Sequence, residues 1–226
     1  MWNLPPPPSF QGLREDLALE VYFRHMPHWR QEGATYFVTF RLDDSLPQAK
    51  LQELAAWRME WERRHPRPQS EANWQELSRE VMRSVEVWLD QGIGNCVLRD
   101  PANALVMIET LHYFDGQRYE LASYVVMPNH VHLLVRPLNE DEHSLENIVQ
   151  SWKQFTAKHI NRRLDKSGSV WQEESFDRIV RDAEHLYRCI QYIEANPSKA
   201  GLTADACPRW IRPRWEACGW KFESTT

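Results

Sequence analysis

The sequence predicts an α+β fold: a ferredoxin-like antiparallel sheet in the order βαββαβ, with its helices on one face, an inserted helical hairpin and an extra C-terminal helix. Strands are predicted at 34–42, where large apolar residues alternate, and along two apolar runs between 119 and 136. Apolar residues recur at helical spacing over 101–114 and 145–164, and a short strand is predicted at 176–180. This succession of elements is the ferredoxin-like order.

Two helical stripes of apolar residues predict the insertion. They lie within 45–91 and are separated by Pro66 and Pro68, which break helices. Positive and negative charges are mixed along both stripes, as on solvated helix faces. We therefore expect a helical hairpin inserted after the first strand.

Capping residues mark where the later helices begin. Asp100 precedes a proline, Ser144 precedes the long helix, and Asp182 precedes the last clear helix, predicted at 183–196. That helix is expected to end before Pro197, because the residue preceding a proline disfavours the helical conformation.

The domain organisation follows from these elements. We expect an N-terminal Pro-containing tail at 1–32, one domain at 33–205 that includes the helical insertion at 45–91, and an irregular C-terminal extension at 206–226. The 226 residues, 42% of them hydrophobic, suffice for a core.

Charge and composition limit the classes of function. The net charge of −5 gives no global basic signature, so a polyanion would need a local patch. The four cysteines form no CxxC pair, which disfavours a zinc ribbon. The chain shows neither a signal peptide nor an apolar run long enough to span a membrane, so we expect a soluble, cytoplasmic protein.

A His-Val-His sequence opens the second of the two apolar runs, after a Pro-Asn turn. Neither run alternates cleanly, which predicts burial on both faces, and the His-Val-His strand would be central in the sheet. In a strand, His130 and His132 share one face. Two adjacent imidazoles are half of a divalent metal site. The alternative is a pair of surface histidines on an edge strand.

The last helix carries a second constellation. At about 100° per residue, Arg188, Tyr192 and Asn196 lie together along one flank, whereas Tyr187 lies roughly 140° from Tyr192. The alternatives are a half-buried aromatic at the edge of a core helix, and an asparagine that bonds locally at the helix end.

Together the two constellations predict a chemistry. A phenol, with a pKa of about 10, needs a metal-polarised electrophile or an adjacent base before it attacks. His130, His132 and the Asn196 amide would leave open positions on Mg²⁺ or Mn²⁺ that phosphate oxygens fit. We therefore predict that Tyr192 attacks a phosphodiester to form a phosphotyrosine intermediate.

Basic residues on the long helix are candidate phosphate contacts. Lys153, Lys158 and Arg162 lie off its apolar stripe, and Arg188 adds a cation beside Tyr192. The alternative for the first three is an ordinary solvated face.

An ordered set of motifs covering roughly 33–205 resembles the REP-associated tyrosine transposases, a group of HUH single-tyrosine transposases. The motifs are Tyr124–Leu134 (YVVMPNHVHLL), Ser151–Thr156 (SWKQFT), Val170–Glu173 (VWQE), Phe176–Asp182 (FDRIVRD) and Tyr192–Leu202 (YIEANPSKAGL). The resemblance implies a metal-dependent enzyme that cleaves and rejoins single-stranded, hairpin-bearing DNA, resembling repetitive extragenic palindromes, through a 5′-phosphotyrosine. It also implies a nucleoid-associated monomer or homodimer.

By the same resemblance, His130 and His132 match the metal ligands and Tyr192 matches the nucleophile, on the extra C-terminal helix. Asn196 stands where many relatives of the wider family have a glutamine. The helical insertion and the acidic net charge depart from the shorter, more basic members.

Two further functions stay open on the sequence alone. One is a domesticated relative that binds structured single-stranded DNA without cutting it. The other is an unrelated His-x-His hydrolase of small phosphoesters, which the lack of a nearby Asp/Glu-rich metal motif disfavours. The intact set of His130, His132 and Tyr192 favours the cleaving enzyme.

Overall fold

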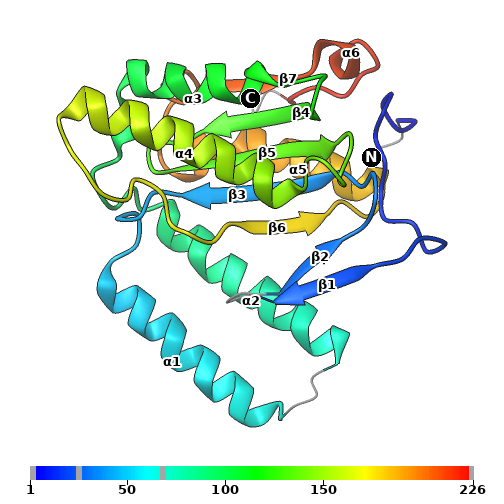
Figure 1. Ribbon diagram of the computed structural model, residues 1–226, viewed down its shortest axis with the longest axis horizontal. Coiled ribbons are helices and arrows are strands. Elements are labelled where there is room, and N and C mark those ends of the chain that lie inside the picture. Colours follow the sequence, from blue (N-terminus) through cyan, green and yellow to red (C-terminus); the bar gives the residue numbers. More distant parts are fainter. Residues whose placement is uncertain (1–3, 24–26, 67–69, 224–226) are drawn as a thin grey trace.

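The centre of the molecule is an antiparallel five-stranded sheet in the order β6-β3-β5-β4-β7 (Figure 1). The computed structural model describes residues 4–23, 27–66 and 70–223. The sheet strands, in spatial order, are β6 (Phe176–Ile179), β3 (Tyr36–Arg41), β5 (His130–Pro137), β4 (Tyr119–Val126) and β7 (Arg209–Ile211). The prediction that the His-Val-His strand is central is confirmed, since β5 lies between β3 and β4.

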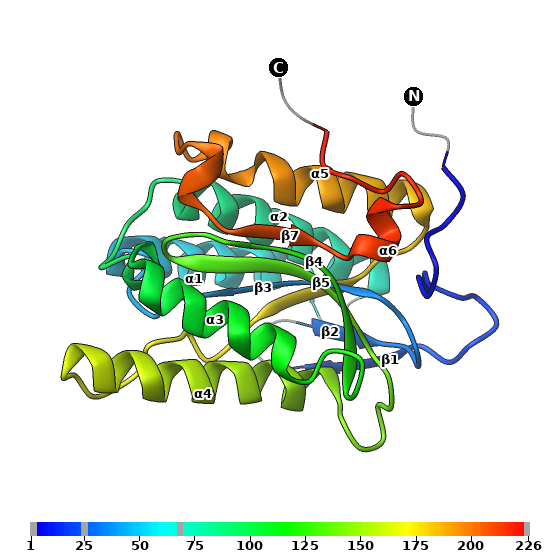
Figure 2. The ribbon, with the colours of Figure 1, turned by 90° about the horizontal axis from the view of Figure 1, so that it is seen from above.

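The helices that connect these strands lie on one face. α3 (Pro101–Tyr113) joins β3 to β4, and α4 (Leu145–Leu164) joins β5 to β6. α5 (Ala183–Lys199) covers the opposite face (Figure 2). The order β3-α3-β4-β5-α4-β6 and the strand arrangement confirm the ferredoxin-like fold, with α5 as the extra helix.

Both faces of the sheet are packed. One core joins the sheet to α3 and α4 and includes Phe40, Leu133 and Trp152; the other joins it to α5 and includes Phe37 and Leu134. Adjacent residues of a strand point to opposite faces, so the residues on both faces of β3 and β5 are largely apolar. This explains why neither run alternates in the sequence.

The helical caps form as predicted. Asp100, Ser144 and Asp182 each accept a hydrogen bond from a backbone N–H in the first turn of the helix that follows. The predicted end of the last helix is wrong, because α5 continues through Pro197 to Lys199. Pro197 lies in the last turn, where the amides of Ala200 and Leu202 still bond to the carbonyls of Asn196 and Pro197.

The predicted insertion is a helical hairpin of α1 (Gln48–Arg64) and α2 (Glu71–Leu89). Ser70 caps α2, and Pro68, one of the prolines expected to separate the helices, lies outside the described residues. The hairpin has its own small core, which Phe176 of β6 adjoins. α2 therefore runs along the β6 edge of the sheet (Figure 1).

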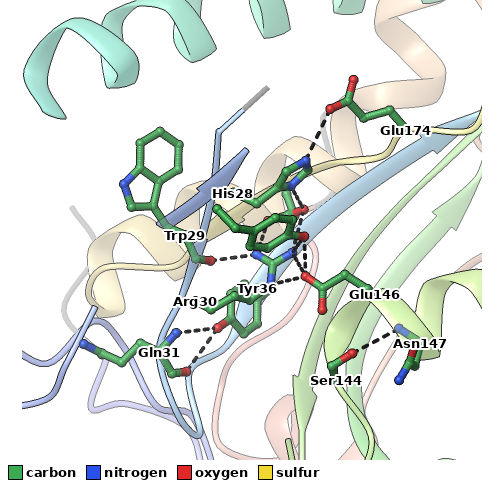
Figure 3. A network of polar contacts seen from close by, with 11 residues as sticks. His28, Trp29, Arg30, Gln31, Tyr36, Ser144, Glu146, Asn147 and Glu174 are labelled. Carbon is green, nitrogen blue, oxygen red and sulfur yellow. Dashed lines mark hydrogen bonds and ion pairs between the residues drawn. The ribbon is translucent and has the colours of Figure 1, made fainter. Parts of the chain in front are cut away.

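Two short strands precede the sheet. β1 (Glu20–Phe23) and β2 (Pro27–Arg30) form a separate antiparallel pair, and charged side chains hold β2 against the domain. Arg30 is ion-paired with Asp177 of β6 and with Glu146 of α4, and His28 bonds to Asp177 and Glu174 (Figure 3). These charges are buried but mutually compensated.

The residues expected to be irregular at 206–226 contribute regular structure. They include β7 and the short helix α6 (Pro213–Glu216), and two 3-10 turns lie elsewhere, at Val97–Arg99 and Ala204–Ala206. The Trp215 and Trp220 indoles are buried and donate to the carbonyls of Pro8 and Pro5. The two ends of the chain are thereby packed together.

Candidate functional site

His130 and His132 project from β5 toward α5, where Asn196 and Tyr192 face them. The two imidazole centroids are 4.5 Å apart, and the Tyr192 ring lies edge-on to His132 at 5.1 Å. His130 Nε2 is 3.3 Å from Asn196 Oδ1. The structure therefore brings together the four residues that the sequence predicted as nucleophile and metal ligands.

A neighbour fixes the orientation of each imidazole. Asn129 donates its amide N–H to the carbonyls of Leu89 and Ile93, which turns its Oδ1 toward His130 Nδ1 at 2.8 Å. His130 Nδ1 is then the protonated nitrogen, and Nε2 carries the lone pair. His132 Nδ1 is 2.7 Å from Thr39 Oγ1, its register partner on β3. Such partners commonly orient histidine ligands.

Both imidazoles are held in the neutral form. His130 and His132 are almost fully buried, and burial lowers the pKa of His130 to about 4, against the opposing contact with Asn196. Burial, together with the neighbouring His130, lowers the pKa of His132 well below its ordinary value. Neutral imidazole is the form that ligates a metal.

The donor set fits a divalent cation. With Nδ1 protonated, His130 Nε2 and Asn196 Oδ1 are both acceptors, and a cation between them would satisfy both. Across the described ranges 4–23, 27–66 and 70–223, no three His, Cys, Asp or Glu side chains gather as a metal cluster. The candidate set is therefore two imidazoles and an amide, which leaves coordination positions for substrate oxygens.

Tyr192 is half-buried beside the histidines. Its ring is edge-on to Phe37 at 5.8 Å, and Lys199 Nζ lies 4.2 Å from the ring centroid. Burial and the nearby carboxylates of Glu86 and Asp90 raise the pKa of the phenol far above its ordinary value. The hydroxyl is therefore protonated at neutral pH and requires activation before it can act as a nucleophile.

Glu86 is a site residue that the sequence analysis missed. It lies near the end of α2, and its carboxylate interacts with the Tyr192 hydroxyl. Burial raises the pKa of Glu86, and the charge of Arg178 opposes that shift. Its mixed-charge helix looked like a solvated face, and no local pattern indicates that α2 packs on the site.

The predicted DNA-contacting residues are not gathered at this site. Lys153, Lys158 and Arg162 lie on α4, across the sheet from α5, and Lys153 Nζ donates to the carbonyls of residues 172 and 173. Arg188 is exposed one turn before Tyr192 and is ion-paired with Glu184 at 3.7 Å. Tyr187, the tyrosine of this helix that is not predicted to be the nucleophile, interacts with Glu223.

Comparison with known proteins agrees with the sequence resemblance. Residues 107–196 match the family model described as "Transposase IS200 like", a range that contains His130, His132, Tyr192 and Asn196. A putative REP-associated tyrosine transposase of Haemophilus influenzae (strain ATCC 51907 / DSM 11121 / KW20 / Rd) is 28% identical over 92 residues. That match covers 37% of this chain and 52% of the relative, so the chain spans about half the length of the relative.

A solved structure is also similar, "Structure of the REP associates tyrosine transposase bound to a REP hairpin". It shares 16% identity and a TM-score of 0.38, covering 80% of this chain and 74% of that chain. None of the helices in the described part of the chain combines the length and the hydrophobicity that a membrane span requires. The resemblance to the REP-associated tyrosine transposases is confirmed.

Proposed function

We propose that this chain, which matches the IS200-like transposase model over 107–196, is a metal-dependent transposase that cleaves and rejoins single-stranded, hairpin-bearing DNA. The observation that carries the proposal is the meeting of Tyr192 with His130, His132 and Asn196, residues brought together from β5 and α5. A phenol beside a phosphate-binding metal site suits phosphodiester attack better than hydrolysis by water.

In this proposal, His130, His132 and Asn196 hold Mg²⁺ or Mn²⁺, which when bound polarises the scissile phosphate. The Tyr192 oxygen forms a bond to phosphorus, and the bond from phosphorus to the 3′ oxygen breaks. The departing 3′ oxygen takes a proton from water, so the products are a 5′-phosphotyrosine and a free 3′ hydroxyl. The phenolic proton passes to the Glu86 carboxylate, which interacts with that hydroxyl and whose pKa burial raises above its ordinary value. Rejoining reverses these steps with a new 3′ hydroxyl.

The substrate and setting are part of the proposal. The relative is named as a putative REP-associated tyrosine transposase. We propose that this chain acts on hairpin DNA that resembles repetitive extragenic palindromes. We also propose that the protein acts in the cytoplasm with the nucleoid, where such DNA lies, and that it is a monomer or homodimer.

The test is loss of cleavage when the phenol oxygen is removed. Tyr192→Phe should lower cleavage of labelled hairpin DNA by on the order of 10³-fold or more in the presence of Mn²⁺, while binding persists. Tyr187→Phe is the matched control on the same helix and should cleave like the wild type. Strand breakage that persists in Tyr192→Phe would contradict the proposal. DNA binding without cleavage in the wild type would indicate a non-cleaving binder.

A further inference from the structure

A groove lies between the inserted hairpin and the main domain. Its cavity of about 390 Å³ is bounded by α2 on one side and by β6 and the start of α5 on the other. We call it the insertion groove. Its walls include residues of α2, such as Met82, and of β6, such as Phe176 and Ile179. The mechanism proposed above does not use most of this surface.

The rim of the insertion groove is basic. Arg79 and Arg83 are one turn apart on α2, and Arg178 and Arg181 lie opposite them on or just after β6. All four side chains belong to exposed residues, and within the described part of the chain none forms an ion pair. Two carboxylates also line the groove: Arg30 and His28 compensate the charge of Asp177, and Arg178 interacts with Glu86. This rim is a local positive patch on an acidic protein.

Two buried polar atoms among the lining residues lack partners. Trp29 Nε1 and Ser78 Oγ have no hydrogen-bond partner within the described residues. The Trp29 ring points away from the compensated charges of Arg30 and Glu146 (Figure 3). Both atoms have almost no accessible surface, so a ligand in the groove would contact these two residues through their other atoms.

The groove is continuous with the candidate active site. Glu86 lines it and interacts with the Tyr192 hydroxyl. Phe37 also lines it, with its ring edge-on to Tyr192, and the Arg178 guanidinium lies 4.8 Å from the Phe37 ring centroid. A strand bound in the groove would thus reach the nucleophile.

We propose that the insertion groove binds the single-stranded DNA segment adjoining the cleaved phosphate. This inference rests on the proposed function. The arginines contact phosphates, and the apolar and aromatic floor receives bases, the combination by which single-stranded nucleic acid is held without sequence readout. The inserted hairpin, which has no counterpart among the expected family features, is therefore a strand-binding element.

The experiment compares two double variants of the inserted hairpin. Arg79→Ala/Arg83→Ala removes two charges from the groove, and Arg63→Ala/Arg64→Ala removes two exposed charges from α1 as the matched control. Binding is measured by fluorescence anisotropy for a DNA hairpin with a single-stranded extension and for the same hairpin without it. The proteins carry Tyr192→Phe, so cleavage does not enter the measurement.

The extension should strengthen binding by the parent protein and by the α1 variant, and this gain should disappear in the groove variant. The slope of log affinity against log salt for the extended hairpin should fall by about 1.4 in the groove variant, or about 0.7 for each lost contact. An unchanged gain and slope would overturn the inference while leaving the proposed function standing. Equal weakening for both hairpins would assign the arginines to the duplex and also overturn it.

The failure of the proposed function gives a different result. If the wild-type protein leaves extended hairpin DNA uncut, the transposase proposal fails. Loss of the extension-dependent gain in the groove variant would still show that the insertion groove binds the single-stranded segment. If neither hairpin binds the parent protein, both proposals are overturned.

Discussion

At His132, a single hydroxyl determines which ring nitrogen faces the candidate metal site. Thr39 Oγ1 is 2.7 Å from His132 Nδ1, and the two residues are register partners across β3 and β5. The shared face of His130 and His132 follows from strand periodicity alone, so the sequence could predict it. Their burial followed from the two non-alternating runs. The elements that bury them could not be predicted, because α5 and α2 come from distant parts of the chain.

Replacing Thr39 by valine tests this positioning role. Valine keeps the shape of the side chain and removes the hydroxyl, so Mn²⁺ affinity should fall by about 10–100-fold, as for other residues that orient a ligand. Isothermal calorimetry measures the affinity.

Thr110→Val on α3 is the control, since the Thr110 hydroxyl bonds to its own helix and should not influence the metal. Unchanged Mn²⁺ affinity in Thr39→Val would show that the hydroxyl does not orient the ring. Loss of all Mn²⁺ binding in the control would show that the effect is a general loss of structure. The two imidazoles themselves are too deeply buried for alanine to be a neutral replacement, because each would leave a cavity.

At the scale of elements, the attachment of β2 to β6 depends on one buried charge cluster. His28 bonds to Asp177 and Glu174, and Arg30 is paired with Asp177 and Glu146 (Figure 3). Burial alone would lower the pKa of His28, but its hydrogen bonds to the two carboxylates outweigh that effect and raise the pKa to about 9. The folded protein therefore keeps His28 charged where the unfolded chain does not.

This raised pKa predicts how stability depends on pH. The contribution of protonated His28 is fully present below about pH 6.5, the unfolded value. Between about pH 6.5 and 9 the folded state binds the extra proton, so the free energy of unfolding falls as pH rises. The loss should be roughly 1–3 kcal/mol, measured by urea unfolding across this range.

In His28→Gln the free energy of unfolding should change less with pH over the same range. His159→Gln is the control, because His159 is an exposed residue of α4 and should leave the curve as in the wild type. A wild-type stability that stays constant from pH 6.5 to 9 would contradict a charged His28 in the folded state.

The order of the elements was predictable because each has a local signature. Asp100, Ser144 and Asp182 indicate where their helices begin, because their short side chains cap the first turn. The end of α5 was not predictable, because the helix accommodates Pro197 through hydrogen bonds that the residues after this proline donate to its last turn. The pairing of β7 with β4 was also missed, because a three-residue strand carries too little periodicity to be recognised.

At the scale of the whole molecule, the inserted hairpin reaches the site that the shared motifs build. Asn129 bonds to the carbonyls of Leu89 and Ile93, so the end of α2 is fixed beside His130. The sequence shows that the insertion is helical but not which face of the sheet it meets. In the proposal for the insertion groove, this placement puts the DNA strand between α2 and β6, whose arginines line the groove. The predicted phosphate contacts on α4 remain a separate prediction.

The central claim is that Tyr192 is the residue that becomes joined to DNA, and peptide mapping of the covalent adduct tests it most directly. Wild-type protein is incubated with Mn²⁺ and single-stranded hairpin DNA, then digested and analysed by mass spectrometry. We predict a nucleotide attached through its 5′ phosphate to the peptide containing Tyr192, together with a released strand that ends in a 3′ hydroxyl. An adduct on Tyr187 or any other residue, or strand breakage with no adduct, would contradict the account.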